Sequence, residues 1–368
     1  MEELELDTSH LPGISEEAVK EYKGNSELLV EAVNESLANR EDIGDLIGDN
    51  SIEKMFNNHE NHVRFMTNVF LLNDYDLLAR TVIWVYRTYH AHGFSYDYFP
   101  VELEAWRQAV NDQLKSESAA PINKIYSFLL ENHEEFIQYS EKIEELSFDV
   151  SGEWQGTYEE FLESLMKGDH RKAIEQAEET VNSRENAEGF FEDVLRPAMY
   201  SIGARWQNGE LSVAEEHLAS SIVSRVLSVL YSRISTLDTT KGRAVVTATA
   251  NEFHEIGSRI IADSLEMDGW NVDHLGVDTP IPELIDMLKK RRPFILGLSL
   301  TIPFNLENVV ETIEEVRNHP ELDDMKILVG GKAFNDNPEL RERTGADAWC
   351  ENSTEAKEVA REWWRERN

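Results

Sequence analysis

Glu252-Phe-His254-Glu-Ile-Gly257 is the stretch that decides the fold, because two shorter elements follow it at wide spacings. After 41 intervening residues (258–298) the chain reads Ser299-Leu-Thr301, and after 28 more (302–329) it reads Gly330-Gly331. A lone His-x-x-Gly would indicate only a surface histidine on a loop before a helix. The meaning of the three elements depends on where they fall in the secondary structure.

Around these elements, strand-like and helix-like segments alternate. The strands are predicted at 243–250, 270–275, 294–300, 326–329 and 347–350, and the helices at 256–267, 281–290, 306–318, 338–343 and 354–364. Such alternation predicts an α/β domain over residues 241–368, with a doubly wound, flavodoxin-like parallel sheet. Ligands of these sheets bind at the carboxyl ends of the strands, where His254, Ser299 and Gly330 all fall.

The pattern (Asp/Glu)-x-His-x-x-Gly, Ser-x-Thr, Gly-Gly resembles the signature of the cobalamin-binding domain shared by methionine synthase, corrinoid methyltransferase proteins and cobalamin photoreceptors. The resemblance implies that His254 ligates cobalt and that Glu252 orients its ring through the second nitrogen. It also implies a tunnel of small residues for the nucleotide tail of the cofactor. The tunnel residues would be Gly257, Ser299, Thr301, Gly330 and Gly331. The family usually has Asp at the place of Glu252 and often Leu at that of Thr301.

The preceding segment is helical throughout and predicts a four-helix-bundle cap over residues 151–237. Its helices are predicted at 158–167, 171–181, 190–207 and 213–232. Trp206, nine residues, then Glu216-His217 resembles the motif of CarH-type adenosylcobalamin photoreceptors, in which these side chains enclose the adenosyl group. Light-sensing members often have histidine directly after the tryptophan, whereas this chain has Gln207. The structural alternatives are a core tryptophan and a solvated Glu-His pair.

The first 150 residues are also predicted to be helical, and a globin-like all-α domain fits the helix lengths. Its last two helices are predicted at about 101–114 and 121–143, followed by a linker near Ser147 and Phe148. Histidines, arginines and a dense set of aromatics suit a flat, conjugated ligand with carboxylate arms. The candidate bilin-binding residues are His59, His62, Arg64, Arg87, His90, Tyr96 and Tyr98. A bilin, a haem and no ligand remain open. The layout resembles the photocobilins, which hold cobalamin and biliverdin, and favours a bilin, held without a thioether bond because this region lacks cysteine.

Composition limits the function classes. The formal charge of −36, from 71 acidic and 35 basic residues, disfavours binding to nucleic acid or to an anionic membrane. Dispersed acidity also suits a salt-rich cytoplasm. The single cysteine, Cys350, excludes an intrachain disulfide. With neither a signal peptide nor a long apolar run, a cytoplasmic protein is expected.

The resemblance as a whole implies a light sensor rather than an enzyme. Adenosylcobalamin, with biliverdin as a second pigment, would absorb light, and photolysis of the Co–C bond would change the cap and the oligomeric state. The expected oligomer is a homodimer or homotetramer that signals to a separate output protein. The alternatives are a corrinoid methyl carrier of a methyltransferase system and a cobalamin store or chaperone.

Overall fold

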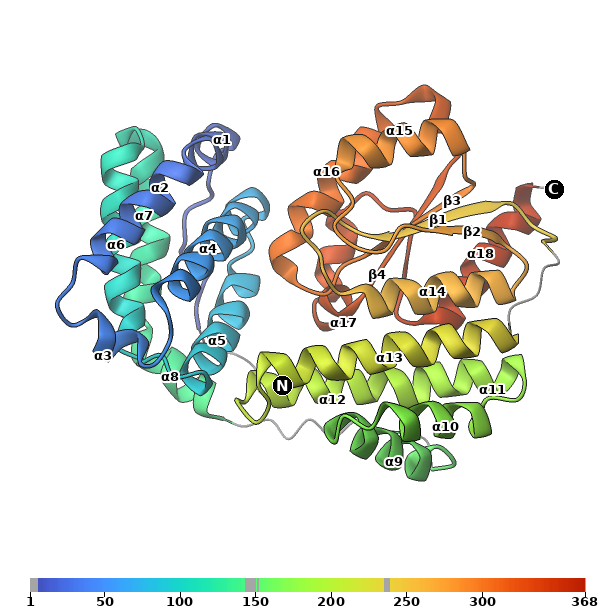
Figure 1. Cartoon of the computed structure of the whole chain (residues 1–368). Coiled ribbons are helices and arrows are strands. Elements are labelled where there is room, and N and C mark those ends of the chain that lie inside the picture. The colour runs from blue at the N-terminus through green and yellow to red at the C-terminus, as the bar shows by residue number, and fades with distance from the viewer. Residues whose placement is uncertain (1–5, 143–149, 151, 235–238, 368) are drawn as a thin grey trace. The chain divides into compact units, whose positions relative to one another are not determined.

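The computed structural model describes residues 6–142, 150, 152–234 and 239–367. The chain forms two compact units, one made of residues 1–145 with 207–210 and the other of residues 146–206 with 211–368. Figure 1 labels most of the helices and strands of both. The division into three domains at 150 and near 240 stays a prediction, and the linker expected at Ser147 and Phe148 lies outside the described residues.

A five-stranded sheet forms the centre of the α/β domain. Its strands are β1 (Arg243–Ala248), β2 (Asn271–His274), β3 (Ile295–Ser299), β4 (Lys326–Gly330) and β5 (Ala348–Cys350). All neighbouring pairs are parallel, and the strand order is β2-β1-β3-β4-β5. This order confirms the predicted parallel, doubly wound sheet. The direction of winding reverses between β1 and β3, which is where such folds bind their ligands.

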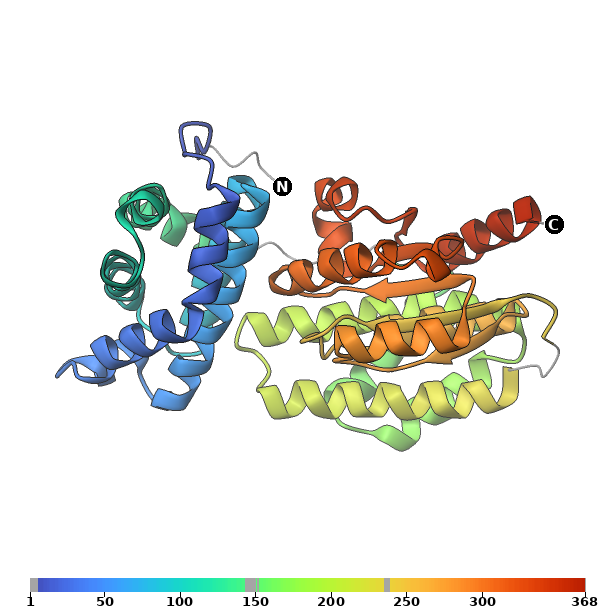
Figure 2. The same ribbon diagram turned by 90° about the horizontal axis from the view of Figure 1, so that it is seen from above.

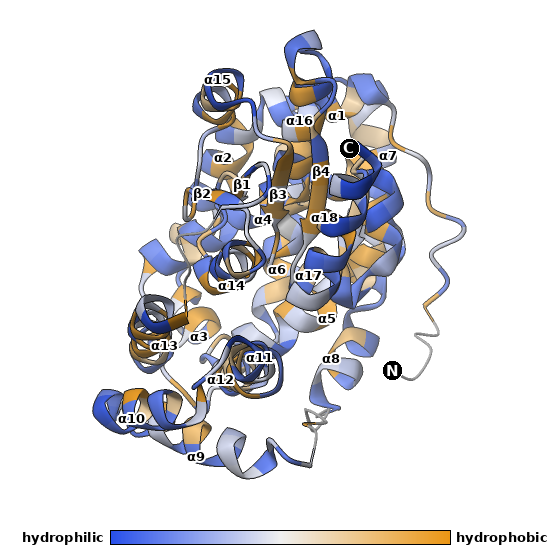
Figure 3. Cartoon of the chain, turned by 90° about the vertical axis from the view of Figure 1, so that its right-hand side faces the viewer, coloured by the Kyte–Doolittle hydropathy of each residue, from blue (hydrophilic) through white to orange (hydrophobic). Residues whose placement is uncertain are grey.

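The central strands are buried because helices cover both faces of the sheet. Every residue of β3 is buried, and the core strands β3 and β4 are strongly hydrophobic in Figure 3. Helices α14 and α18 cover one face, and α15 and α16 cover the other (Figure 1). The helices that follow the strands are α14 (Glu255–Met267), α15 (Ile281–Arg291), α16 (Leu306–Arg317), α17 (Lys332–Asp336) and α18 (Ser353–Arg367). The helix expected at 338–343 is a 3-10 helix, and α17 was not predicted.

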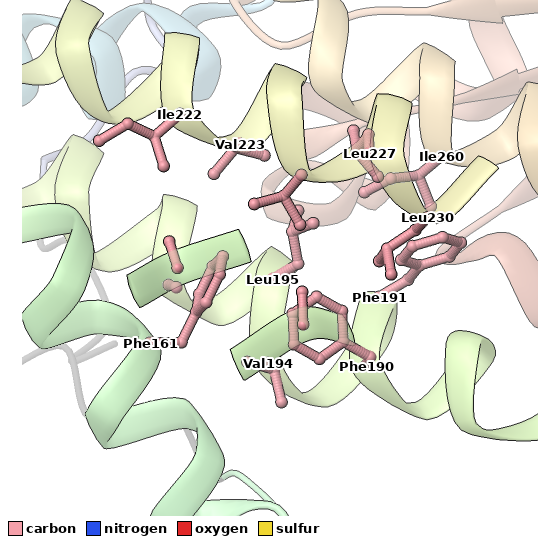
Figure 4. Packing of buried hydrophobic residues seen from close by; sticks show 14 of the residues in the cluster. Phe161, Phe190, Phe191, Val194, Leu195, Ile222, Val223, Leu227, Leu230 and Ile260 are labelled. Atoms are coloured by element: carbon pink, nitrogen blue, oxygen red, sulfur yellow. The ribbon is translucent and has the colours of Figure 1, made fainter. Parts of the chain in front are cut away.

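The segment before the sheet is a helical bundle, as expected. Its elements are α9 (Gln155–Met166), α10 (His170–Thr180), α11 (Arg184–Gly189), a π-helix (Phe190–Leu195), α12 (Arg196–Gln207) and α13 (Val213–Ile234). The expected third helix therefore begins earlier and contains a π-helical turn in the middle of one continuous rod. Phe161, Phe190 and Leu227 belong to its buried core (Figure 4). Figure 2 shows α13 running roughly along the direction of the strands.

The bundle is joined to the α/β domain through two helices of that domain. Ile260 and Met267 of α14 belong to the same apolar cluster as the bundle core. The second helix is α18, whose buried Lys357 pairs with Glu188 of α11. The amide of Ser353, at the start of α18, donates to the carboxylate of Glu192 on the π-helix at 2.9 Å. Apolar packing and polar contacts thus fix the bundle beside the sheet.

The first unit consists of helices among its described residues. They are α1 (Glu16–Gly24), α2 (Ser26–Ala38), α3 (Ile43–Ile47), α4 (Ile52–Leu72), α5 (Tyr75–Ala91), α6 (Tyr98–Gln113), α7 (Ser116–Glu131) and α8 (His133–Glu141). The expectation of one helix from 121 to 143 is wrong. That helix ends at Glu131, and Asn132 turns its side chain back to the Phe128 carbonyl at 2.8 Å. A globin-like arrangement stays a prediction.

Candidate functional site

The histidine stretch forms a short loop between β1 and α14, and hydrogen bonds hold this loop in place. Asn251 adopts a left-handed φ of 59°, and its amide donates to the side chain of Asp278 at 2.8 Å. The amide of Asp278 in turn donates to the Glu252 carbonyl at 3.0 Å. Sequence reasoning missed Asp278, because nothing local marks a loop residue that supports a neighbouring strand end. Together these bonds hold the loop in which Glu252 is buried, and they leave His254 at the N-cap of α14.

Glu252 is fully buried and receives hydrogen bonds from two directions. Its Oε1 lies 2.5 Å from His254 Nδ1, and its Oε2 accepts from the amides of Thr301 and Ile302 at 2.9 and 3.0 Å. The longer glutamate side chain therefore reaches both the imidazole and the loop after β3. With Nδ1 donating to the carboxylate, Nε2 of His254 is the ring nitrogen left for a ligand.

The electrostatics of this pair favour a charged carboxylate. Burial raises the pKa of Glu252, but hydrogen bonds from His254 and from the Ile302 and Thr301 amides outweigh it, so that the net pKa lies below its usual value. Burial lowers the pKa of His254, while the hydrogen bond and charge of Glu252, and the charge of Glu216, raise it above its ordinary value. An anionic Glu252 keeps the proton on Nδ1 and increases the basicity of the imidazole.

The small residues of the signature meet at one edge of the sheet. In the strand register Ala248 pairs with Ser299, Ser299 with Gly330, and Gly330 with Cys350. His254 and Thr301 follow the ends of β1 and β3, so the structure brings together the signature residues assigned to the cobalt ligand and the tunnel. This proximity follows from parallel strands whose carboxyl ends share one edge.

The glycines of this edge differ in why they are glycine. Gly331 has a φ of 109°, and a Cβ there would lie 2.3 Å from the Leu300 carbonyl oxygen. A Cβ on Gly330 would lie 2.9 Å from the Cys350 carbonyl oxygen. The backbone itself therefore requires glycine at both positions. Gly257 is different, because a Cβ there would meet only Ser299 Oγ, at 3.7 Å.

The space beside Gly257 and Ser299 gives a test of whether the residues suit a cobalamin. The fold does not need a glycine at 257, so the missing side chain leaves room beside the sheet edge. Nearby, the buried Thr249 hydroxyl has no hydrogen-bond partner among the described residues. An imidazole with a free nitrogen, a buried carboxylate behind it and a buried hydroxyl without a partner at the strand ends fit such a cofactor.

The cap residues are placed in three different environments. Trp206, at the end of α12, is partly buried and packs against the bundle core, as a structural tryptophan does. Glu216, on the first turn of α13, accepts from Ser220 Oγ at 2.8 Å and lies 2.7 Å from His217 Nδ1. The Glu216 charge is close enough to His254 to raise its pKa. The His217 side chain is 74% exposed. Of the three, the structure links Glu216 to the cobalt-ligand candidate.

The seven candidate bilin residues do not converge on one place. His59 and Tyr98 are buried, and His59 Nε2 lies 2.8 Å from the Tyr98 hydroxyl. His62 Nε2 is hydrogen-bonded to the Tyr126 hydroxyl at 3.1 Å. Arg64 pairs with Glu60 on the surface of α4. Arg87 donates to the carbonyl of Ser140, in α8, at 3.0 Å. The last two candidates, His90 and Tyr96, stack on each other with their ring centroids 3.9 Å apart.

Sequence reasoning missed the centre of the buried cluster in this unit, which is Glu102. Its Oε1 accepts from Trp106 Nε1 at 3.2 Å and lies 3.9 Å from both His59 Nε2 and His62 Nδ1. Burial raises the pKa of Glu102 to about 7. The signal was a single acid at a helical position whose neighbours, Phe99 and Trp106, are core residues. Within the described parts of the chain, no three acid, histidine or cysteine side chains are arranged to hold a metal ion.

Comparison with known proteins assigns the class. Two family models match the chain, both described as a B12 binding domain, over residues 157–231 and 242–360. The chain is thus a cobalamin-binding protein, in which the helical bundle and the α/β domain both match B12-binding domains. The two matches lie between residues 157 and 360. They confirm the expected cofactor class, whereas the adenosyl form is a finer expectation.

Relatives agree with this class, and a solved structure agrees with the fold. Dimethylamine corrinoid protein 1 of Methanosarcina mazei is 24% identical over 192 residues, or 52% of this chain and 86% of the relative. Trimethylamine corrinoid protein 1 of Methanosarcina acetivorans is 24% identical over 190 residues, which are 51% of this chain and 87% of that relative. The monomethylamine corrinoid protein of Methanosarcina barkeri gives a TM-score of 0.50 at 20% identity, covering 57% of this chain and 99% of that one, which shows the fold.

The membrane expectation can also be compared with the structure. None of the helices in the described ranges combines the length and the apolar character needed to cross a bilayer.

Proposed function

We propose that this protein is the corrinoid-carrying component of a methyltransferase system, the alternative to the light sensor expected from the sequence. The observation that carries this proposal is the hydrogen-bonded pair of His254 and Glu252 at the switch point of the sheet. It is supported by relatives that match about half of this chain and are corrinoid proteins for dimethylamine and trimethylamine. The proposed substrate class is a small methylated amine.

The chain's own residues would hold and orient the cofactor. His254 would ligate cobalt through Nε2, and the small residues Gly257, Ser299 and Gly330 would line the part of the site that accepts the nucleotide tail. Glu252 would keep the imidazole in one tautomer and one orientation through its bonds to Nδ1 and to the Thr301 amide. Bound cobalamin supplies a cobalt atom that can accept a methyl group and release it to an acceptor.

The cap bears on the choice between carrier and sensor. A methyl carrier needs access to the upper face of the cofactor, and a bulky tryptophan lying over that face would oppose it. Trp206 packs against the bundle core, and Gln207 replaces the histidine that light-sensing members often have. Both observations favour the carrier. The light sensor, the adenosyl form, biliverdin and the homo-oligomer stay predictions.

Methyl loading tests the proposal. The tagged full chain, loaded with cobalamin and reduced, would be incubated with methyl-labelled mono-, di- or trimethylamine and the soluble extract of its source cells, and then re-isolated. We expect label on the wild-type chain that light releases, because alkyl–cobalt bonds are photolabile, and little label on the His254→Ala variant. Absence of label from all three amines would contradict the proposed substrate class.

The sensor is tested in parallel with the same chain. The adenosylcobalamin form would be passed through gel filtration in the dark and after green light. A carrier is expected to elute at the same volume in both states. A change in oligomeric mass on illumination would favour the light sensor over the carrier.

A further inference from the structure

Phe253 lies between the cobalt-ligand candidate and its orienting carboxylate, and its side chain faces solvent. It is 69% exposed, the highest value for a large apolar side chain in the described parts of the chain. Its neighbour Glu252 is fully buried. The loop thus turns Glu252 into the interior and presents Phe253 to solvent, directly beside His254 in the chain.

The loop cannot easily turn this ring inward. The Asn251 amide is bonded to Asp278, and the Asn251 carbonyl accepts from Asn305 Nδ2 at 2.9 Å. The Glu252 amide donates to the Thr249 carbonyl at 3.1 Å, and the Glu252 carbonyl accepts from Asp278. Rotating Phe253 into the core would break several of these bonds and move the carboxylate that holds His254. The backbone therefore keeps the aromatic side chain on the solvent side of the loop.

Single exposed apolar side chains are common and often have no function. This one differs in its position, because the loop that exposes it also positions His254. It differs also in chemistry, since a rigid ring loses little conformational entropy when a ligand covers it. An aromatic side chain can bury roughly 150–250 Å². A flat macrocycle ligated by His254 extends well beyond the imidazole, so an exposed ring on the adjacent residue lies within the region that it can reach.

We propose that Phe253 is a preformed apolar contact for the corrin macrocycle. It supplies cobalamin affinity independently of the bond between His254 and cobalt. The inference rests on the proposed cobalamin site but not on methyl transfer. It assigns a role to a position that the signature leaves unspecified, and it explains why the most exposed large apolar side chain of the described residues stands next to the cobalt-ligand candidate.

Titration of the full chain with hydroxocobalamin in the dark tests this inference, with visible absorbance and quenching of tryptophan fluorescence as readouts. Phe253→Ala is expected to raise the Kd about tenfold to a hundredfold, the effect of losing the burial of one aromatic side chain. Phe253→Leu should recover most of the affinity. At saturation the alanine variant should show the wild-type spectrum, because His254 still ligates cobalt.

Two controls separate this effect from misfolding. The thermal unfolding midpoint of cofactor-free Phe253→Ala should match that of the wild type, since the side chain is exposed. Met166→Ala removes another exposed apolar side chain, 39% exposed at the end of α9, and should leave the Kd unchanged. A Phe253→Ala Kd within about twofold of the wild type overturns the proposal, and slowed methyl transfer with unchanged affinity would assign Phe253 to a protein partner instead.

The outcomes also separate this inference from the proposed function. If the wild type binds cobalamin and accepts no methyl group while Phe253→Ala binds weakly, the carrier proposal fails and the macrocycle contact stands. If methyl transfer is confirmed and Phe253→Ala binds normally, only the contact fails. A bound spectrum in Phe253→Ala that matches that of His254→Ala would mean that Phe253 positions the ligand, which also overturns the contact.

Discussion

Two regions of this molecule place histidine beside glutamate, with opposite results. At the sheet edge, Glu252 receives the His254 ring and two backbone amides, its pKa is lowered, and the His254 side chain is 50% exposed. In the helical unit, Glu102 has the Trp106 indole as donor and its pKa rises to about 7, while His59 is completely buried.

The difference teaches that the number of donors and access to solvent decide what such a pair can do. A buried carboxylate stays charged when several donors stabilise its anion. It then orients an imidazole whose other nitrogen is free to bind. With one donor and no solvent, the carboxyl tends to be neutral, and burial lowers the pKa of His59 and of His62 to about 3. That cluster is arranged as a packed polar core.

The largest expected effect comes from removing the solvent-accessible histidine, His254. His254→Ala should weaken cobalamin binding by at least about a hundredfold, because even partners of metal ligands contribute 10–100-fold to affinity. The residual bound cofactor should show the spectrum of cobalamin without a protein imidazole. Absorbance titration measures both. An unchanged spectrum would remove His254 from the cobalt and undo the comparison.

The next effect separates the two carboxylates. Glu252→Gln keeps an oxygen for the Thr301 and Ile302 amides but loses the anion that accepts from His254 Nδ1. We expect cobalamin affinity to fall about 10–100-fold, as for other partners of metal ligands, with the bound spectrum largely retained. The matched substitution in the other unit, Glu102→Gln, should leave affinity unchanged. Equal effects of the two variants would contradict the assignment of Glu252.

Glu102 should instead affect stability as a function of pH. Because its folded pKa of about 7 is raised above the usual 4.5, the folded state holds its proton more tightly than the unfolded state. Its contribution is complete below about pH 4.5 and is lost as pH rises to about 7, on the order of 3 kcal/mol. Relative to Glu102→Gln, the wild type should therefore become less stable between pH 5 and pH 8.

Denaturant unfolding followed by circular dichroism at both pH values measures that difference. Burial lowers the pKa of His59 and His62 and makes stability rise with pH below about 6.5, but these contributions are common to both proteins and cancel in the comparison. If the free energy of unfolding of the wild type rises relative to that of Glu102→Gln as the pH increases, the pKa of Glu102 is not raised.

The smallest effect is expected for the exposed cap histidine. His217→Ala removes a side chain that is 74% exposed and contacts Glu216, so affinity for hydroxocobalamin should change less than about twofold and stability by less than about 0.5 kcal/mol. Titration and thermal unfolding measure both. A large loss of affinity would mean that the Glu216-His217 pair touches the cofactor and would strengthen the photoreceptor interpretation of the cap.

The sequence predicted the features that depend on local patterns. The strands and helices of the α/β domain follow from periodicity, and the proximity of His254, Ser299 and Gly330 follows from parallel strand ends. The bond from Glu252 to the Thr301 amide could not be predicted, because it depends on side-chain reach between two loops. For the same reason Glu102 and Asp278 were missed, since burial and loop support arise from distant parts of the chain.

The N-terminal unit shows the other limit of sequence reasoning. Histidines at helical spacing indicate a shared face, but they do not distinguish a ligand pocket from a packed interior. His59 is held between Asn34 and Tyr98, at 2.5 and 2.8 Å. These partners come from helices α2 and α6, so the helix that contains the histidine gives no sign of them. A bilin or a haem in this unit therefore stays a prediction.

The π-helix at Phe190–Leu195 has an evolutionary consequence. A π turn holds one residue more than an α turn, so deleting one residue within 190–195 could restore a regular α-helix. Each residue of an α-helix advances the chain by about 100°, whereas residues of the wider π turn advance it by less, so the extra residue is taken up within the turn. Such a deletion would therefore leave the two halves of the helix in nearly the same rotational phase, with Glu188 still facing Lys357 and Trp206 still against the bundle core. Homologues that lack this residue should therefore retain both contacts without compensating changes.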